Sequence, residues 1–401
     1  MGVFALLTGL PQSEGRSFGI RINIMSSSRR DFLKLLGISA AAAMPAEAAA
    51  GSSEKSGGGS RPDFIRLDTN EGAYGPSEKV VEAMRKAASE ANRVPTVRVY
   101  ELLEQIAKSH NVTPDQVILG AGSTEILRMA SAAFLGGGKQ LVQASPTFPA
   151  LEFYARSIGA EVISDPLNRQ FGHDLNAMLA HAGPNTGLVY ICNPNNPTGS
   201  ITPRPILEDF ISRLPASCCV LIDEAYHHYA GQSGSYASFL DRPLNDPRLT
   251  VSRTFSHAYG LAGLRIGYGI ASTDFARRVR VFATADSVGT LAAVAARAAL
   301  DDAVSLKEFI KRNADDRQEF VNQAISRRLN SLDSHTNFVA LDTSNPTNVV
   351  VQHFRSNNIL IAPVSLSWDT WIRVSLGKPE DMQAFWRVWD TLPIDKFNVR
   401  H

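Results

Sequence analysis

The sequence predicts an α/β protein with a large domain built on a mainly parallel sheet and a smaller α+β domain. From Val117 onward, short apolar runs alternate with longer amphipathic segments, which is typical of strands connected by helices. The runs lack the strict apolar–polar alternation of a half-exposed strand, so both faces of the sheet are expected to be covered. At 401 residues, the chain is long enough for two domains.

The first part of the chain resembles a targeting segment. Arg29 and Arg30 precede a weakly apolar stretch, Leu35 to Met44, and a small-residue cleavage site follows at 45–48. This order resembles a twin-arginine export signal, so residues 1–48 are predicted to direct the protein to the periplasm. The alternatives left open are an Ala-rich tail and a start at Met25 instead of Met1. Residues 49–62 are predicted to form a Gly/Ser-rich flexible linker.

Residues 63–95 are expected to be an N-terminal segment that packs with the small domain, with a helix from about Ser77. Residues 96–275 form the predicted large domain, and a helix from Val99 to His110 opens it. Its expected strands are Val117–Leu119, Gln140–Ala144, Gly187–Cys192, Cys218–Asp223, Leu249–Phe255 and Leu264–Ile270. Its other expected helices are Ser123–Phe134, Phe148–Ile158 and Arg204–Leu214. The small domain, residues 276–401, is expected to be helical to about Leu329 and then to form strands at Asn337–Asp342, Ile359–Ile361 and Trp371–Leu376.

The composition narrows the class of protein. Hydrophobic residues make up 44% and charged residues 20% of the chain, as in soluble globular proteins. A net charge of +1 argues against nucleic acid or an acidic membrane surface as the main partner. The three cysteines, Cys192, Cys218 and Cys219, lie in apolar runs and are expected to be buried thiols.

Two stretches place polar groups where strands are expected to end. Gly120–Glu125 follows a strand and opens a helix, so backbone N–H groups at Gly122 and Ser123 could hold an anion. A tight turn is the alternative, and the missing last glycine excludes a dinucleotide fingerprint. Asp223 ends a buried strand, at the edge where α/β sheets bind ligands. A buried carboxylate needs a cation or a strong hydrogen-bond donor opposite it, and a ligand could supply one. The alternative is that Asp223 only caps the loop that follows the strand.

Two further stretches add to this pattern. Asn193–Gly199 contains two X-Pro steps and a glycine, which indicates a rigid loop after a strand. Ser256 and Arg265, separated by a Gly- and Ala-rich turn, are natural donors to phosphate.

With these motifs in this order, the chain resembles the pyridoxal-phosphate (PLP) enzymes, and most closely the histidinol-phosphate aminotransferase family of the class I and II aminotransferases. The resemblance runs from about residue 64 to the C-terminus. It implies the aspartate-aminotransferase-like PLP fold (fold type I), PLP as cofactor, an amino acid or related amine as substrate, and a homodimer. No nucleic acid, no metal and no membrane contact beyond the export signal are expected.

The resemblance also implies residue roles. Phe148 would lie against the pyridine ring, Asn196 and Tyr226 would contact the phenolic oxygen, and Asp223 would face the ring nitrogen. Arg373 would grip the substrate carboxylate, and Asn70 would lie near the substrate. The full cofactor-binding set implied is Gly122, Ser123, Phe148, Asn196, Asp223, Tyr226, Ser256 and Arg265.

One position departs from the family. The family carries its Schiff-base lysine directly after the serine that matches Ser256, and this chain has His257 there. An imidazole cannot form a stable Schiff base, but it can move protons, because histidine titrates near pH ~6.5. No lysine occurs between Lys139 and Lys307. We therefore expect noncovalent PLP, with His257, Asp223 and Tyr226 as the catalytic residues. Val94 also stands where the family usually has tyrosine.

Three hypotheses follow from this departure. The chain could be an ordinary but slow aminotransferase. It could be a lysine-less enzyme of elimination, racemisation or half-transamination, similar to the keto-deoxysugar dehydratase of this fold, with His257 as acid and base. It could also be a binding protein for PLP or an amino acid that has lost catalysis. A metal site at His227 and His228 is not expected, because adjacent side chains on a strand point to opposite faces.

Overall fold

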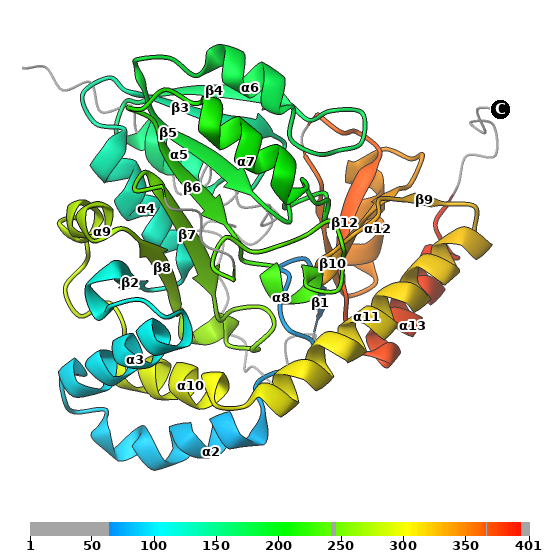
Figure 1. The fold of residues 1–401 in the computed structure, drawn as a ribbon. Helices are drawn as coiled ribbons and strands as arrows, with labels where there is room; N and C mark the ends of the chain where they lie inside the picture. Colours follow the sequence, from blue (N-terminus) through cyan, green and yellow to red (C-terminus); the bar gives the residue numbers. More distant parts are fainter. Residues whose placement is uncertain (1–63, 242–245, 366, 394–401) are drawn as a thin grey trace, which may run out of the picture.

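The computed structural model describes residues 64–241, 246–365 and 367–393. The predicted signal region, 1–48, and the predicted linker, 49–62, lie outside the described residues. Within the described ranges the chain forms two sheets, each with its own covering helices (Figure 1). No helix in these ranges is both long enough and apolar enough to span a bilayer.

The larger sheet is mainly parallel, as predicted. In the described chain it has seven strands in the order β2-β8-β7-β6-β5-β3-β4, and β8 runs antiparallel to both of its neighbours. The strands are β2 (Val117–Gly120), β3 (Gln140–Ser145), β4 (Glu161–Pro166), β5 (Thr186–Cys192), β6 (Cys219–Asp223), β7 (Leu249–Thr254) and β8 (Gly267–Ala271). The carboxyl ends of β2, β5, β6 and β7 therefore share one edge of the sheet with the start of β8.

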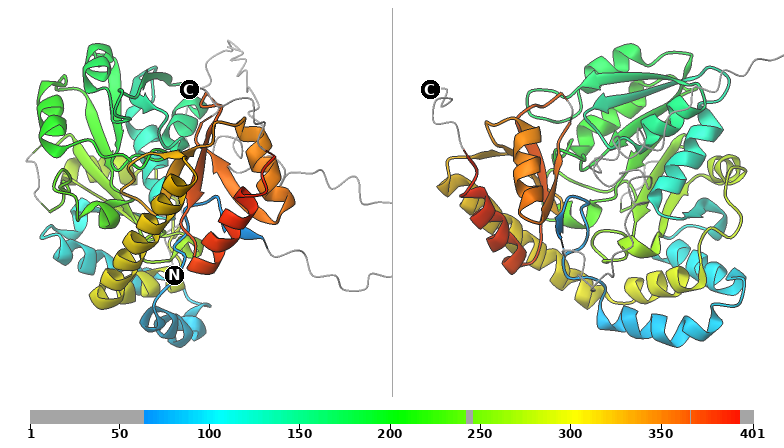
Figure 2. Two further views of the ribbon diagram at one scale, coloured as in Figure 1. Left: turned by 90° about the vertical axis from the view of Figure 1, so that its right-hand side faces the viewer. Right: turned by 180° about the vertical axis from the view of Figure 1, so that it is seen from behind.

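Helices cover both faces of this sheet (Figures 1 and 2). One face carries α4 (Ser123–Phe134), α5 (Ala150–Ser157) and α9 (Thr273–Arg280), and the other carries α6 (Leu175–His181) and α7 (Arg204–Arg213). Alternate residues of β5 supply the two cores: Leu188 and Tyr190 pack on the α4 side, and Val189 and Ile191 on the α7 side. Burial of both faces explains why the strand sequences are apolar without alternation.

The sequence reasoning missed β4 and α6 and misplaced the start of β8. The strand β4 is an edge strand with mostly half-buried or exposed residues, so it has no apolar run, and α6 is only seven residues long. The strand expected from Leu264 begins at Gly267. The reason is that η5 (Ala262–Leu264) is a 3-10 turn and Arg265 adopts a left-handed backbone with φ 53°.

The smaller sheet joins the start of the described chain to its end. Its strands have the order β1-β11-β12-β10-β9, and β1 pairs in parallel with β11, Ile65 opposite Ile359. The strands are β1 (Ile65–Leu67), β9 (Asn330–Ser331), β10 (Phe338–Asp342), β11 (Ile359–Pro363) and β12 (Trp371–Ser375), and the helices beside them are α11 (Ala303–Ser326), α12 (Thr347–Ser356) and α13 (Pro379–Trp389). An aromatic cluster that includes Phe320, Phe354 and Phe385 packs between this sheet and these helices.

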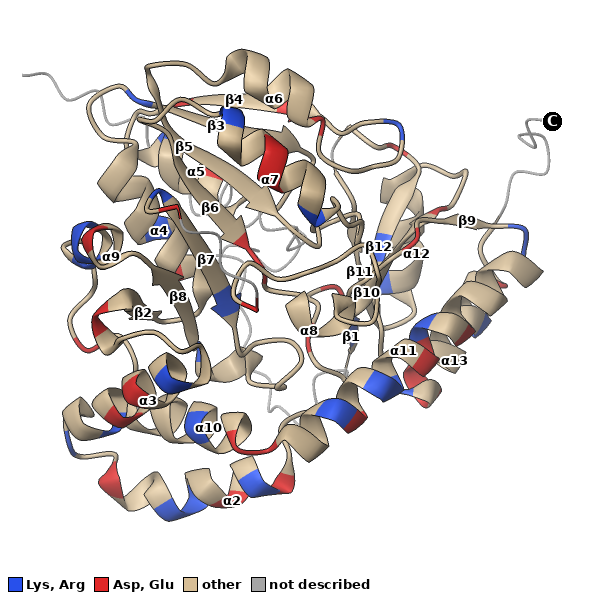
Figure 3. Ribbon diagram, viewed as in Figure 1, with Lys and Arg blue, Asp and Glu red and all other residues tan. Residues whose placement is uncertain are grey.

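A third group of helices flanks the larger sheet at the end marked by β2 and β8 (Figures 1 and 2). Its members are α2 (Glu78–Ala87), η3 (Ala88–Glu90), α3 (Thr96–Ser109), η4 (Pro114–Gln116) and α10 (Thr290–Leu300). Acidic and basic residues are interspersed along α2 and α11 (Figure 3), and on α2 Arg85 pairs with Glu78 and Glu82. All three cysteines are buried and free, as predicted.

Candidate active site

The strand order brings the predicted site residues to one edge of the larger sheet. Because β2, β5, β6 and β7 are parallel to one another, the segments that follow them emerge at the same edge. Cys192 pairs with Asp223, and Gly267 pairs with both Thr254 and Gly120. The predicted residues at this edge are Gly122, Ser123, Asn196, Asp223, Ser256 and Arg265.

A group of donors suited to an anion lies where α4 begins. Ser123 opens the helix and Gly122 precedes it, with φ 80° and ψ 163°, a conformation open almost only to glycine. Arg265 donates from Nη1 to Ser256 Oγ and from Nη2 to Thr124 Oγ1, both at 3.4 Å. A Cβ atom at residue 122 would collide with the guanidinium. Helix N–H groups, a guanidinium and hydroxyls together can hold a phosphate. Sequence reasoning missed Thr124, which carries no signal beyond its place in the first turn.

Asp223 is buried at the end of β6 without a basic partner. Its Oδ2 accepts a hydrogen bond from the Tyr190 hydroxyl at 3.0 Å, and its Oδ1 accepts one from the Ala225 backbone N–H at 3.2 Å. No ion pair of the described residues involves it. Burial raises the pKa of Asp223 to about 6. A buried carboxylate with this environment can receive a cationic or N–H group of a ligand. Sequence reasoning missed Tyr190, which reads as one more core residue of an apolar run.

Replacing Asp223 by Asn is expected to stabilise the protein in the absence of ligand. Because burial raises the pKa in the folded state, the carboxyl group destabilises the fold at high pH, and this cost disappears as pH falls below its ordinary value of 3.8. At ~1.4 kcal/mol for each pH unit between 3.8 and about 6, the cost above pH 6 is on the order of 3 kcal/mol. Denaturant unfolding of Asp223→Asn and the wild type from pH 4 to 8 measures it.

Asp209→Asn, on the exposed face of α7, is the matched control for that experiment. Equal unfolding free energies for Asp223→Asn and the wild type at pH 8 would contradict the expectation.

The side chains of Tyr226, Asn70, Asn196 and Arg373 form one hydrogen-bonded network. The Tyr226 hydroxyl accepts from Asn70 Nδ2 at 2.9 Å and from Asn196 Nδ2 at 3.4 Å. Arg373 Nη1 donates to Asn196 Oδ1 at 2.8 Å, and its Nη2 donates to the Asp68 carbonyl at 2.6 Å. Two donors stay without an acceptor among the described residues: the Tyr226 O–H and the buried Nε of Arg373.

His257 lies beside this network. Its ring stacks on Tyr226, with centroids 4.5 Å apart and planes 14° apart, and its Nδ1 lies 2.7 Å from the Asn70 carbonyl oxygen. Burial, with smaller contributions from the charges of Arg373 and Arg265, lowers the pKa of His257 to about 4. The imidazole is therefore neutral at pH 7 and can accept a proton.

None of the described lysines lies at this site. Lys139 precedes β3, at the opposite edge of the sheet, and donates to the Pro184 carbonyl. The other described lysines are exposed: Lys79, Lys86, Lys108, Lys307, Lys311 and Lys378. Phe148, the remaining predicted site residue, is half-buried. It packs against the core that lies between the larger sheet and the helices α4, α5 and α9.

The stated reason against a metal at His227 and His228 is wrong. The two residues lie on the short helix α8 (His227–Ala230), not on a strand, because the chain turns immediately after Asp223. Their ring centroids are 4.8 Å apart. Burial lowers the pKa of both imidazoles. Within the described part of the chain, no three or more His, Cys, Asp or Glu side chains are grouped as metal ligands.

This donor set fits PLP. The anion-binding group formed by Gly122, Ser256 and Arg265 suits a phosphate. The buried carboxylate of Asp223 suits a ring nitrogen. The unpartnered hydroxyl hydrogen of Tyr226 suits a ring oxygen.

A family model, sequence relatives and solved structures all place this chain among the aminotransferases. A family model for class I and II aminotransferases matches residues 62–388. Histidinol-phosphate aminotransferase 2 of Carboxydothermus hydrogenoformans is 35% identical over 322 residues, 80% of this chain and 88% of that relative. The crystal structure of histidinol-phosphate aminotransferase from Sinorhizobium meliloti in complex with pyridoxal-5'-phosphate superposes with a TM-score of 0.77 at 27% identity, over 83% of this chain and 90% of that one.

A more distant structure identifies the fold. The aspartate aminotransferase from Thermus thermophilus with maleate superposes with a TM-score of 0.70 at 20% identity, over 81% of this chain and 92% of that one. The predicted aspartate-aminotransferase-like fold is thereby confirmed.

Proposed function

The chain belongs to the histidinol-phosphate aminotransferase family of class I and II aminotransferases, and from this premise we propose that it binds PLP noncovalently and uses His257 to move the Cα proton of an amino acid or related amine. PLP is the cofactor expected for the family. When bound, it supplies an electron sink for negative charge at the substrate Cα.

In this proposal the anion-binding group at the start of α4 would hold the phosphate. Gly122 and Ser123 contribute backbone N–H groups, and Ser256 and Arg265 contribute side-chain donors. The close approach of Arg265 to Gly122 supports a compact phosphate contact, because no side chain separates them.

The remaining contacts orient the ring. Asp223 would face the ring nitrogen and favour its protonated form, while Asn196 and Tyr226 would contact the ring oxygen and Phe148 would lie against the ring. The raised pKa of Asp223 supports this role, because a cation opposite the carboxylate relieves its desolvation.

One observation carries the part of the proposal that concerns His257. A neutral imidazole contacts the Tyr226 and Asn70 network, and no described lysine lies there. A neutral imidazole can accept a proton, but it cannot hold the aldehyde covalently as an amine does. Arg373 would bind the substrate carboxylate through donors that now contact Asn196 and Asp68.

Two further proposals concern assembly and location. Exposed apolar side chains at and before the start of α3, Val94, Val97 and Tyr100, support a homodimer. A monomer in sedimentation experiments would overturn that. The twin-arginine pattern of residues 1–48 supports export to the periplasm. Recovery of the protein only from the cytoplasmic fraction would overturn it.

The test of function is exchange of the substrate Cα hydrogen. With PLP, amino acids and D₂O, the wild-type protein is expected to exchange the Cα hydrogen of its substrate, and His257→Gln is expected to lose at least ~10²-fold in rate, as for a lost general base. Proton NMR over a panel of amino acids measures this, and PLP absorbance measures binding.

Two outcomes would contradict this function. PLP binding without exchange in the wild type would indicate a binding protein that has lost catalysis. Equal exchange rates in wild type and His257→Gln would assign the proton transfer to another group.

A further inference from the structure

The carbonyl oxygen of Asn70 accepts hydrogen bonds from two side chains. His257 Nδ1 lies 2.7 Å from it, and Asn337 Nδ2 donates to it at 2.9 Å. A carbonyl oxygen only accepts, so the hydrogen of this contact must lie on Nδ1. In a neutral imidazole the other nitrogen, Nε2, then holds the free lone pair. No described residue donates a hydrogen bond to Nε2.

The carbonyl is fixed in place from several sides. Asn70 has a left-handed backbone with φ 55°, an uncommon conformation for a residue other than glycine. Its backbone N–H donates to Ser375 Oγ at 2.8 Å, and its Oδ1 accepts from the same hydroxyl at 3.0 Å. Its Nδ2 donates to the Tyr226 hydroxyl. The residue that carries the acceptor is therefore tied to β12 and to the ring stacked on His257.

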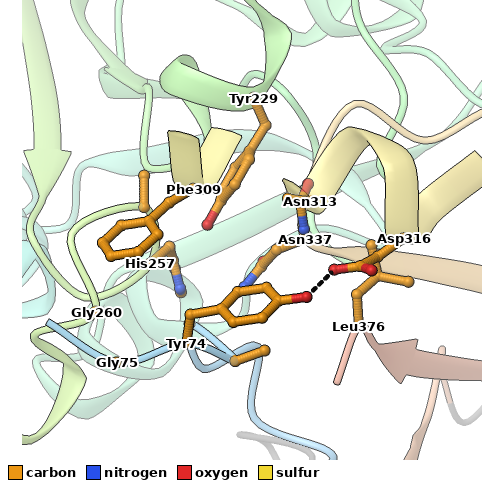
Figure 4. A pocket seen from close by; sticks show the side chains of 13 residues that line it. Tyr74, Gly75, Tyr229, His257, Gly260, Phe309, Asn313, Asp316, Asn337 and Leu376 are labelled. Atoms are coloured by element: carbon orange, nitrogen blue, oxygen red, sulfur yellow. Dashed lines mark hydrogen bonds between the residues drawn. The ribbon is translucent and has the colours of Figure 1, made fainter. Parts of the chain in front are cut away.

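Asn337 completes this arrangement from the segment that leads into β10. Its Nδ2 donates to the carbonyls of two successive residues, Asn70 at 2.9 Å and Glu71 at 3.1 Å. The side chain is buried, and its Oδ1 has no partner among the described residues. The opposite amide orientation would point Oδ1 at two carbonyl oxygens, so the contacts determine which atom is the nitrogen. His257 and Asn337 lie side by side in the wall of a cavity that Tyr74 and Tyr229 also line (Figure 4).

We propose that Asn337 is a positioning residue for His257. By holding the Asn70 carbonyl, it keeps the imidazole in the Nδ1–H tautomer, so that Nε2 is the nitrogen that accepts the substrate proton. This inference rests on the proposed function. In the transfer the substrate Cα–H bond breaks, an N–H bond forms at Nε2, and the electron pair stays on the substrate. The other groups that face or charge the imidazole are Tyr226, Arg373 and Arg265.

The experiment reads the tautomer directly, in the full chain without PLP or substrate. Protein with ring-¹⁵N-labelled histidine is measured by NMR at pH 7, with His257→Gln to assign the signals. The wild type is expected to show His257 with Nδ1 protonated and Nε2 unprotonated. Asn337→Leu, close in size but without donors, leaves the Asn70 carbonyl free to turn away from Nδ1. It is expected to lower the ratio of the Nδ1–H to the Nε2–H form by about fivefold or more, because the hydrogen bond from His257 that favours the Nδ1–H form is then weakened or lost.

Asn313→Leu is the matched control. Asn313 lines the same cavity and accepts from Arg317, but it makes no contact with the Asn70 carbonyl, so the tautomer should not change. If Asn337→Leu does not fold, Asn337→Ala also removes the donors, with a smaller side chain, and is expected to shift the ratio in the same direction.

A wild-type His257 protonated at Nε2 would overturn the inference, as would an unchanged ratio in a folded Asn337 variant. Because no cofactor is present, this result is independent of Cα hydrogen exchange. Loss of exchange with the expected tautomer would count against the proposed function alone.

Discussion

A His257→Lys variant is expected to bond covalently to PLP, so that borohydride fixes the cofactor to the chain in stoichiometric amount. Position 257 follows Ser256, which belongs to the anion-binding group. The side chain at this position also contacts Tyr226, which would face the cofactor ring. A lysine amine at this place would have the carbonyl of PLP within reach and would form the bond that an imidazole cannot. Intact mass after reduction and denaturation measures the adduct.

The wild type and His257→Gln are the controls for this experiment. Both are expected to release all their PLP on denaturation after the same treatment. A reduced adduct in the wild type would mean that an amine elsewhere in the chain holds the cofactor, and it would end the proposal of noncovalent binding. A folded His257→Lys variant that binds PLP but gives no adduct would show that position 257 does not face the aldehyde.

Replacing Arg373 by Leu is expected to weaken the binding of an amino acid by about 10²- to 10⁴-fold. The guanidinium is buried, so a substrate carboxylate that took the place of its contacts to Asn196 and Asp68 would pair with it in a site poor in water. Loss of one partner of a buried charge pair costs ~3–5 kcal/mol. Titration of the PLP-loaded protein with an amino acid measures the affinity.

The matching amine without a carboxylate separates this role from a structural one. Its affinity should be nearly the same in Arg373→Leu and the wild type, because it has no group for Arg373 to bind. Arg373→Lys keeps the charge but cannot form two parallel hydrogen bonds, and it is expected to give an intermediate loss. Equal losses for the amino acid and the amine would mean that Arg373 acts only through Asn196 and Asp68.

Sequence reasoning predicted the features that depend on local pattern. The apolar runs of the parallel strands, the glycine before α4 and the Asp at the end of β6 are each visible within a few residues. Parallel strands bring their carboxyl ends together, so the residues that follow them lie at one edge, while the roles expected of the site residues came from the resemblance to the family. The large mainly parallel sheet and the smaller second sheet were predicted from the pattern of apolar runs along the chain.

Features that depend on contacts between distant residues could not be predicted. Asn337 is 267 positions from Asn70, and nothing in its neighbourhood distinguishes it from other polar residues before a strand. Tyr190 reads as a core residue until β5 is placed beside β6, where its hydroxyl reaches Asp223. His227 and His228 were treated as strand residues because the four residues of α8 are too few for a helical period.

The pairing of β1 with β11 bears on when the site can exist during synthesis. Translation delivers Ile65 early and Ile359 only near the end of the chain, yet the two are opposite each other in one sheet. Asn70 lies shortly after β1 and is made early, whereas its partners Asn337 and Ser375 are made late. A nascent or prematurely ended polypeptide therefore lacks the side chains that hold the Asn70 carbonyl, and the proposed orientation of His257 has to await the last strands of the smaller sheet.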